Sequence, residues 1–219
     1  MSRHSKYRTP VRNRDPRCVQ FGGRTYGGLV PLPEKLGMTD IADHRNISAV
    51  EESISIWQEA PKSIMRSSAE FSACRTYRYS LTRSWQTDRS SVLFIGLNPS
   101  TADETVDDPT VRRCVGFARR WGFGEVTLAN LFAFRSTDPA VLAELSDPIG
   151  PGNDDWITKL CQVADLIIVA WGARGSLHER DRAVLTRIPE AYCLGTTKNG
   201  APRHPLYLAA DTHPEPYSG

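Results

Sequence analysis

From residue 91 onward, short apolar runs alternate with segments of helical periodicity. The apolar runs are residues 91–97, 125–131, 166–171 and 191–194. Helical patterns lie between or after them at 109–121, 153–163 and 175–187, with a short one at 138–145. Asn153 is the expected cap of the helix over 153–163. Strands that are apolar along their whole length are typical of parallel sheets that helices cover on both faces. The sequence therefore predicts an α/β domain with three layers, α/β/α, around a central four-stranded and mainly parallel sheet.

The chain before residue 91 differs in composition. Residues 1–38 are basic and rich in Gly and Pro, which is typical of an arm that contacts phosphates or stays solvated. Residues 48–60 predict a helix, and residues 71–86 alternate aromatic residues with arginine in the manner of a strand or hairpin. We therefore expect a loop-rich extension over 1–70 and an α/β domain over 71–219, ending in a loop-like tail from residue 195.

Composition excludes several classes of protein. Of the 219 residues, 40% are hydrophobic and 24% are charged, values that are usual for globular chains. The longest apolar run, 164–171, is far below the ~20 residues that a membrane span needs, and no secretory signal is recognisable. The five cysteines form no CxxC pair, so we expect neither a disulfide framework nor a local metal site. We expect a cytoplasmic protein with no membrane contact and no obligate protein partner.

The residues that come directly after the strands are the candidates for a binding site, because ligands of such sheets bind beyond the carboxyl ends of the strands. The polar residues found there are Asn98, Asn130, Arg135, Arg174, Arg203 and His204. The sequence contains no GxxxxGK[ST], no GxGxxG after the first strand, no HExxH and no HxE…PCxxC. We therefore expect no nucleotide cofactor and no metal at this edge.

Five segments of this chain resemble a widespread bacterial and phage domain of unknown function. They are LFIGLNPSTADETVDDPT, NLFAFRSTDP, GPGND, AWGARG and RHPLYL, spread over about residues 75 to 210. Shorter motifs within them resemble the uracil-DNA glycosylase superfamily. GLNPS at 96–100 is similar to a Gly-x-Asn-Pro catalytic loop, NLFAFR at 130–135 to the end of the second strand, and HPLYL at 204–208 to a His-Pro loop that enters the minor groove.

The resemblance implies a role for each matching position. Asn98 would position a hydrolytic water, Asn130 would read the edge of the base, and His204 would lie against the leaving base and sugar. Gly96, Ser100 and Phe132 would surround the base, and Leu206 and Tyr207 would wedge into the base stack. Leu206 stands where the family usually has Ser or Gly, which leaves the geometry of the wedge open.

The chemistry of N-glycosidic cleavage agrees with these residue types. The reaction needs a held water, a donor to the departing base and an everted nucleotide. An asparagine can orient water but cannot remove its proton, so we expect Asp107 or Asp108 as the base, with Asp103 as a weaker candidate. We select Asp108, although an acid before Pro109 is also typical of a helix cap. No lysine stands in the strand-end motifs, which predicts hydrolysis to an abasic site without strand cleavage.

The substrate prediction depends on the two residues after Pro99. Many uracil-specific relatives place a tyrosine near this proline, whereas this chain has Ser100 and Thr101. Small side chains predict a pocket for a base larger than uracil, a bulky 5-substituted pyrimidine such as glucosylated hydroxymethylcytosine of phage DNA. A role in anti-phage defence and a role in repair are both compatible with this chemistry.

DNA is the expected partner, because Arg135, Arg174 and Arg203 at one edge suit phosphate. Two other functions stay open, a nucleoside or nucleotide hydrolase and a non-catalytic nucleic-acid binding module. Individual residues also have structural interpretations. Asn98 is compatible with a role as a turn residue. Asn130 is compatible with a residue that hydrogen-bonds the backbone at the end of a strand, and His204 with an ordinary histidine of a loop.

Overall fold

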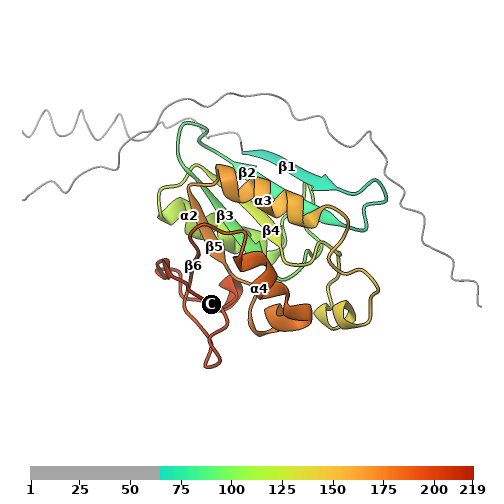
Figure 1. Ribbon diagram of the computed structural model, residues 1–219. Coiled ribbons are helices and arrows are strands. Elements are labelled where there is room, and N and C mark those ends of the chain that lie inside the picture. The colour runs from blue at the N-terminus through green and yellow to red at the C-terminus, as the bar shows by residue number, and fades with distance from the viewer. Residues whose placement is uncertain (1–64) are drawn as a thin grey trace, which may run out of the picture. The chain divides into compact units, whose positions relative to one another are not determined.

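The computed structural model describes residues 65–219, which form an α/β fold around one mixed sheet of seven strands (Figure 1). The strands are β1 (Arg66–Phe71), β2 (Arg78–Ser84), β3 (Ser91–Gly96), β4 (Glu125–Asn130), β5 (Leu166–Val169), β6 (Tyr192–Cys193) and β7 (Glu215–Pro216). The α-helices are α2 (Pro109–Arg120), α3 (Asn153–Val163) and α4 (Arg180–Leu185). The expected arm over 1–38 and helix over 48–60 lie outside the described residues.

The sheet is larger than the four strands expected from the sequence. Its order is β1-β2-β4-β3-β5-β6-β7. The four predicted strands are present and form the parallel part, β4-β3-β5-β6. Strands β1 and β2 add an antiparallel hairpin at one edge, and β7 adds a short antiparallel strand at the other. The hairpin begins at Arg66, before the expected start of the domain at 71, and β7 lies in the tail expected to be loop.

Two apolar clusters lie on opposite faces of the sheet, because alternate residues of a strand point to opposite sides. On one face, Val111, Cys114 and Phe117 of α2 pack with Phe94 of β3. On the other face, side chains of α3 and α4 pack with Leu93 and Ile95 of the same strand, including Ile157 and Val184. Helices therefore cover both faces, as Figure 1 shows for α2 behind the sheet and α3 in front of it.

Helix α2 begins where its sequence predicts. Asp108 is its N-cap, and a carboxylate oxygen accepts a hydrogen bond from the Val111 amide at 2.9 Å. Pro109 occupies the first turn, where its missing N–H is not needed. At the last turn Arg119 and Arg120 are exposed, and the Arg119 guanidinium lies 4.7 Å from the centre of the Trp85 ring.

Two other helical predictions are corrected by the structure, and a third is refined. Gly152, at φ 79°, precedes α3 in the cap position, so Asn153 is not the cap. The short helix expected within 138–145 is present as a 3-10 helix over Pro139–Ala143. The segment 175–187 is divided into a 3-10 helix, Ala173–Glu179, and helix α4, because His178 and Glu179 adopt left-handed conformations that interrupt helical geometry.

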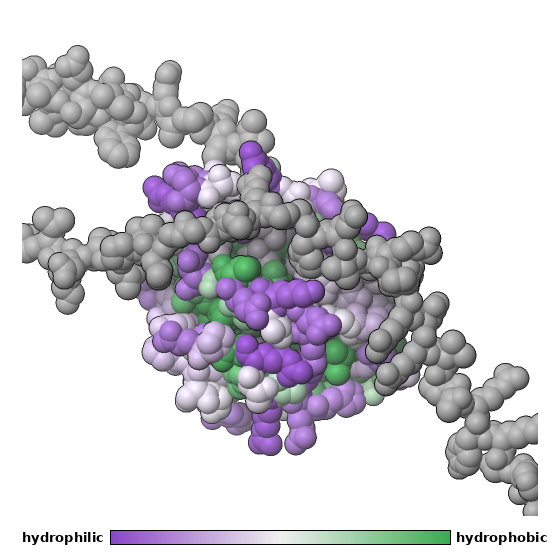
Figure 2. Space-filling model, turned by 45° about the horizontal axis from the view of Figure 1, so that its top comes forward, coloured by the Kyte–Doolittle hydropathy of each residue, from purple (hydrophilic) through white to green (hydrophobic). Residues whose placement is uncertain are grey.

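The surface of the described residues is mainly hydrophilic on the face drawn in Figure 2, as expected when apolar side chains are gathered in two buried clusters. Apolar residues show on this face as smaller areas between the hydrophilic ones. None of the helices within residues 65–219 has the length and apolarity that crossing a bilayer requires.

Candidate functional site

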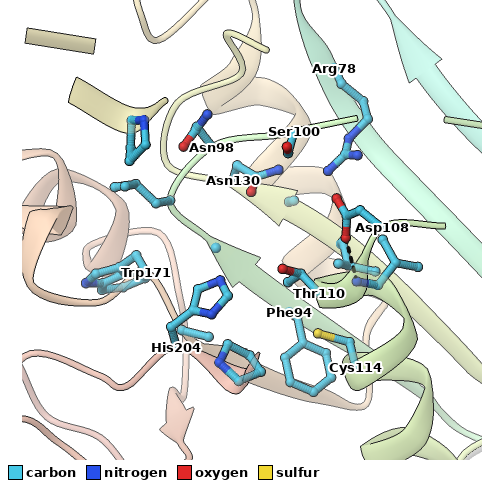
Figure 3. Close-up of a pocket in the computed structure, with 18 residues that line it drawn as sticks. Arg78, Phe94, Asn98, Ser100, Asp108, Thr110, Cys114, Asn130, Trp171 and His204 are labelled. Carbon is cyan, nitrogen blue, oxygen red and sulfur yellow. Dashed lines mark hydrogen bonds between the residues drawn. The ribbon is translucent and has the colours of Figure 1, made fainter. Parts of the chain in front are cut away.

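The carboxyl ends of the parallel strands border a pocket of about 180 Å³ (Figure 3). Gly96 and Asn130 end β3 and β4 and are direct partners in the parallel ladder. Six residues predicted for the site line this pocket, namely Gly96, Asn98, Ser100, Asp108, Asn130 and His204. In Figure 3, Asn98, Asn130 and Ser100 lie along one side of the common space, and His204 lies across from them.

The orientation of the Asn98 amide is fixed by two backbone carbonyls. Its Nδ2 donates to the carbonyl oxygens of Pro99 at 3.0 Å and Ser136 at 2.9 Å. Because both N–H groups are used, the nitrogen and oxygen of this amide are distinguished by their partners. The side-chain oxygen is therefore the group that Asn98 offers to the pocket, and it is an acceptor for water or for an N–H of a ligand.

Asn130 is held at the end of β4 by its neighbours. Its Oδ1 lies close to Gly96, where a Cβ atom would come within 3.0 Å of it. Its Nδ2 is buried and has no hydrogen-bond partner among the described residues. The backbone carbonyl of Asn130 accepts a hydrogen bond from the side chain of buried Asn153, which sequence analysis assigned to a helix cap instead. A buried amide donor facing a pocket is suited to a polar ligand atom.

His204 is placed by a short hairpin that comes after β6. Thr196 and Pro202 form a bridge, and the Pro202 carbonyl accepts from the Gly172 amide at 2.9 Å, which joins this hairpin to the end of β5. The Nδ1 of His204 accepts from the Leu206 amide at 3.3 Å. The proton of the neutral ring therefore sits on Nε2, which makes His204 a donor. Burial lowers the pKa of His204, partly opposed by the negative charge of Asp108.

The structure distinguishes the three candidate acids. Asp103 closes a tight turn, accepting from the amides of Thr105 and Val106 at 2.8 Å. Asp107 forms an ion pair with the buried Arg83 at 2.8 Å. Of the three, Asp108 alone lines the pocket, where its carboxylate also caps α2. Asp107 and Asp108 were both candidates from the sequence, and the selected Asp108 is the one whose position fits the pocket.

Arg78 is a pocket residue that sequence analysis missed. It begins β2, is 3% exposed, and donates from Nη1 to the carbonyl oxygen of Ala102 at 3.0 Å. Burial lowers its pKa to about 10, so the guanidinium keeps its charge at neutral pH. The alternation in 71–86 indicated a half-buried strand, but arginines are mostly exposed, so nothing in the pattern placed this one inside.

An aromatic wall completes the pocket. Trp171, which follows β5, is 2% exposed and lines the pocket together with Phe94 and Cys114. Gly175 packs directly against the indole, because a Cβ atom there would come within 2.0 Å of Trp171 Cδ1. This close approach explains the second glycine of AWGARG. Burial raises the pKa of the Cys114 thiol well above its ordinary range, so this cysteine is an apolar wall residue and not a nucleophile.

The other predicted site residues lie outside the pocket lining. The prediction that Phe132 surrounds the base is wrong. Its ring is fully buried in the cluster beneath α3 and α4, with its centre 6.4 Å from that of the His178 ring, and it does not line the pocket. Arg174 and Arg203 are exposed, whereas Arg135 is half-buried with its guanidinium 4.9 Å from the Phe71 ring. Leu206 and Tyr207 come after His204 in a 3-10 helix, and Tyr207 is 78% exposed.

The described residues offer no ready metal site. Within 65–219, no three His, Cys, Asp or Glu side chains are grouped so that they could hold a metal ion. The pocket instead combines five polar groups beside the aromatic wall. They are the acceptor oxygen of Asn98, the donor nitrogen of Asn130, the donor imidazole of His204, the carboxylate of Asp108 and the guanidinium of Arg78. Such a set suits a small, flat molecule that has both donors and acceptors around its edge.

Comparison with known proteins gives one match. A protein-family model described as "Protein of unknown function (DUF1643)" matches residues 78–206, which is more than half of the chain. No curated protein and no solved structure matches the sequence or the fold. The matched range begins at Arg78 and includes every residue of the pocket lining.

Proposed function

This chain belongs to the DUF1643 family of proteins of unknown function, and we propose that it is a DNA glycosylase that removes a modified base and leaves an abasic site. The observation that carries the proposal is the convergence of Asn98, Asp108 and His204 on one pocket. Asn98 and Asp108 come from the two ends of the loop between β3 and α2, and His204 comes from the chain after β6. The resemblance of these loops to the uracil-DNA glycosylase superfamily supports the same proposal.

The groups that line the pocket match the needs of glycosidic hydrolysis. Two hydrogen bonds donated by Asn98 Nδ2 fix the amide, so that its side-chain oxygen would orient the attacking water. The water oxygen bonds to C1′, the C1′–N bond breaks, and its electron pair leaves with the base. Asp108 would take the proton of the water and stabilise the positive charge on the sugar. His204 would donate from Nε2 to the departing base.

The size of the pocket limits the ligands that it can enclose. A volume of about 180 Å³ is smaller than the ~300–1,000 Å³ typical of sites for drug-sized ligands, and it suits a single flat base. A bulky 5-substituent would have to project past the small side chain of Ser100, which is partly exposed. Excision of glucosylated hydroxymethylcytosine, and with it a role in anti-phage defence, depends on this exit.

The surface beside the pocket favours DNA over a free nucleoside as the substrate. Tyr207 projects into solvent three residues after His204, where it could fill the space of an everted nucleotide. Arg174 and Arg203 are exposed, as contacts with phosphates would require. A nucleoside hydrolase would have no use for such a wedge.

The test uses the full chain and three DNA duplexes that contain uracil, a G·T mismatch or glucosylated 5-hydroxymethylcytosine. We expect base release, detected by mass spectrometry, and strand cleavage only after alkali. Asn98→Ala should abolish release, and Val163→Ala, at the far end of α3, should leave it unchanged. Release from none of the duplexes would overturn the proposal, and hydrolysis of free nucleosides alone would favour the nucleoside hydrolase.

A further inference from the structure

Three arginines of the described chain are almost fully buried, and one of them differs from the other two. Arg83 is 1% exposed and pairs with Asp107, and Arg180 is 3% exposed and pairs with Asp154. Arg78 is equally buried, but within residues 65–219 it forms no ion pair. Its Nη1 donates to the Ala102 carbonyl, whereas its Nε has no hydrogen-bond partner among the described residues.

The surroundings of Arg78 make a negative ligand favourable. Burial is the main cause of its lowered pKa, and the like charges of Arg135 and Arg83 act in the same direction. Asp108 opposes them, but its carboxylate also bonds the Val111 amide. A buried cation without a direct counter-ion is costly, and an anion that enters the pocket removes that cost. Figure 3 places Arg78 beside Asp108 on the side of the pocket away from His204 and Trp171.

We propose that Arg78 binds an anionic oxygen of the molecule that occupies this pocket, and that this oxygen belongs to the base. The inference rests on the proposed function and adds to it the class of base. When the C1′–N bond breaks, the electron pair of that bond passes into the ring and onto a ring carbonyl oxygen. Arg78 receives this charge through its free N–H groups, while the proton of the attacking water passes to Asp108 and then to the released base.

The assignment restricts the substrates to bases that can carry the charge on an oxygen. Pyrimidines have a carbonyl beside the glycosidic nitrogen, and guanine has one conjugated with it. Adenine has no carbonyl oxygen, so this pocket would not stabilise it as a leaving group. An arginine is suited to this role because it stays charged when buried and presents several donors in one plane.

The experiment measures binding and needs no catalysis. The probes are 5-nitrouracil, whose nitro group makes it an anion at neutral pH, and uracil, which has the same ring without the nitro group and is neutral. Affinities for the full-length protein, Arg78→Met and Arg78→Lys are measured by calorimetry, with thermal unfolding as a check that each variant folds. We expect the wild type to bind the anion about tenfold or more tightly than uracil, since hydrogen bonds to charged groups are the stronger ones.

Arg78→Met should remove this preference, and Arg78→Lys, which keeps the charge but loses the planar fork, should retain part of it. Equal binding of the two probes by the wild type, no binding of either, or a preference that survives in Arg78→Met would each overturn the inference. Inorganic phosphate is the third probe: binding of phosphate but not of 5-nitrouracil would assign Arg78 to a phosphate instead and overturn the role at the base. If no base is released from DNA but the wild type still prefers 5-nitrouracil through Arg78, the glycosylase proposal is wrong and the anion site is retained.

Discussion

Asp107 forms an ion pair with Arg83 at 2.8 Å, and this contact gives two neighbouring acids different roles. Arg83 also donates to the carbonyl oxygens of Asp103 and Thr82, so it ties the loop before α2 to strand β2. Asp107 is therefore committed to holding the loop. The next residue, Asp108, faces the pocket from the N-cap position of the helix.

The two acids should consequently respond differently to loss of charge. Asp107→Asn leaves the buried Arg83 without its partner, and we expect the free energy of unfolding to fall toward the low end of ~3–5 kcal/mol, because Asp107 itself is 22% exposed. Asp108→Asn keeps the helix cap, since asparagine caps as well as aspartate, so stability should change little. Base release by Asp108→Asn should fall by ~10²-fold or more.

Urea unfolding and single-turnover base release measure the two effects separately. If Asp107→Asn lowered activity with no loss of stability, the assignment of the two acids would be reversed. Full activity of Asp108→Asn would remove the carboxylate from the mechanism.

A second prediction concerns the glycine that supports the aromatic wall. Gly175→Ala places a methyl group within 2.0 Å of the Trp171 ring, so the indole or the chain after β5 must move. We expect a loss of ~1–3 kcal/mol in the free energy of unfolding, the usual cost of overpacking, together with weaker ligand binding. The tryptophan fluorescence of the folded state should also change.

Gly116→Ala is the matched control, because its Cβ atom would meet only the end of the Arg120 side chain, at 3.5 Å. Gly116 lies inside α2, where alanine is favoured over glycine by ~0.5–1 kcal/mol, so this variant should be more stable than the wild type. Equal effects of the two substitutions would contradict the packing argument.

The sequence was sufficient to predict the centre of this fold, and the reason is periodicity. Strands β3 and β5 are almost entirely apolar because both of their faces are covered, and that pattern is visible without a structure. Strand β7 is two residues long and ends in a proline, so its sequence has no recognisable strand pattern. The 3-10 helix before α4 was also hidden, because the left-handed residues His178 and Glu179 are not glycines.

The site shows the same division. Asn98 and Asn130 were predictable because each lies at or just beyond the end of a strand, and parallel strands bring their carboxyl ends together. His204 lies well beyond the end of β6, and its role was predicted from the resemblance of its loop. Arg78 was not, since it lies at the start of an antiparallel strand whose position in the sheet depends on long-range pairing with β4. Asn153 was assigned to a cap from its residue type, whereas the fold uses it to hold the carbonyls of Asn130 and Leu131.

A third prediction concerns the lowered pKa of His204. Burial favours the neutral ring in the folded protein, so below the ordinary value of 6.5 the unfolded chain takes up the proton more readily. The stability that His204 contributes is therefore complete above pH 6.5 and is lost as the pH falls below it. Between about pH 8 and pH 5, the wild type should lose more stability than His204→Gln, which cannot titrate there.

Urea unfolding of both proteins over this range provides the measurement. The opposite result, a wild type that gains stability relative to His204→Gln on acidification, would mean that Asp108 holds a charged imidazolium in the fold. The neutral Nε2 donor that the proposed mechanism uses would then be wrong.

The last prediction concerns the exposed ring beside the pocket. Tyr207 is 78% exposed, and its ring centre lies 6.0 Å from that of His204. Removal of an exposed side chain usually changes stability by less than ~0.5 kcal/mol, so Tyr207→Ala should unfold like the wild type. If the ring fills the space that an everted nucleotide leaves, its loss removes a stacking contact worth ~1–3 kcal/mol, which is about tenfold in base release from duplex DNA. Single-stranded DNA needs no such filling, so release from it should be nearly unaffected.

Val163→Ala, which shortens another exposed apolar side chain on α3, is the control and should change neither rate. An equal loss on duplex and single strand would assign Tyr207 to general binding and not to eversion of the base.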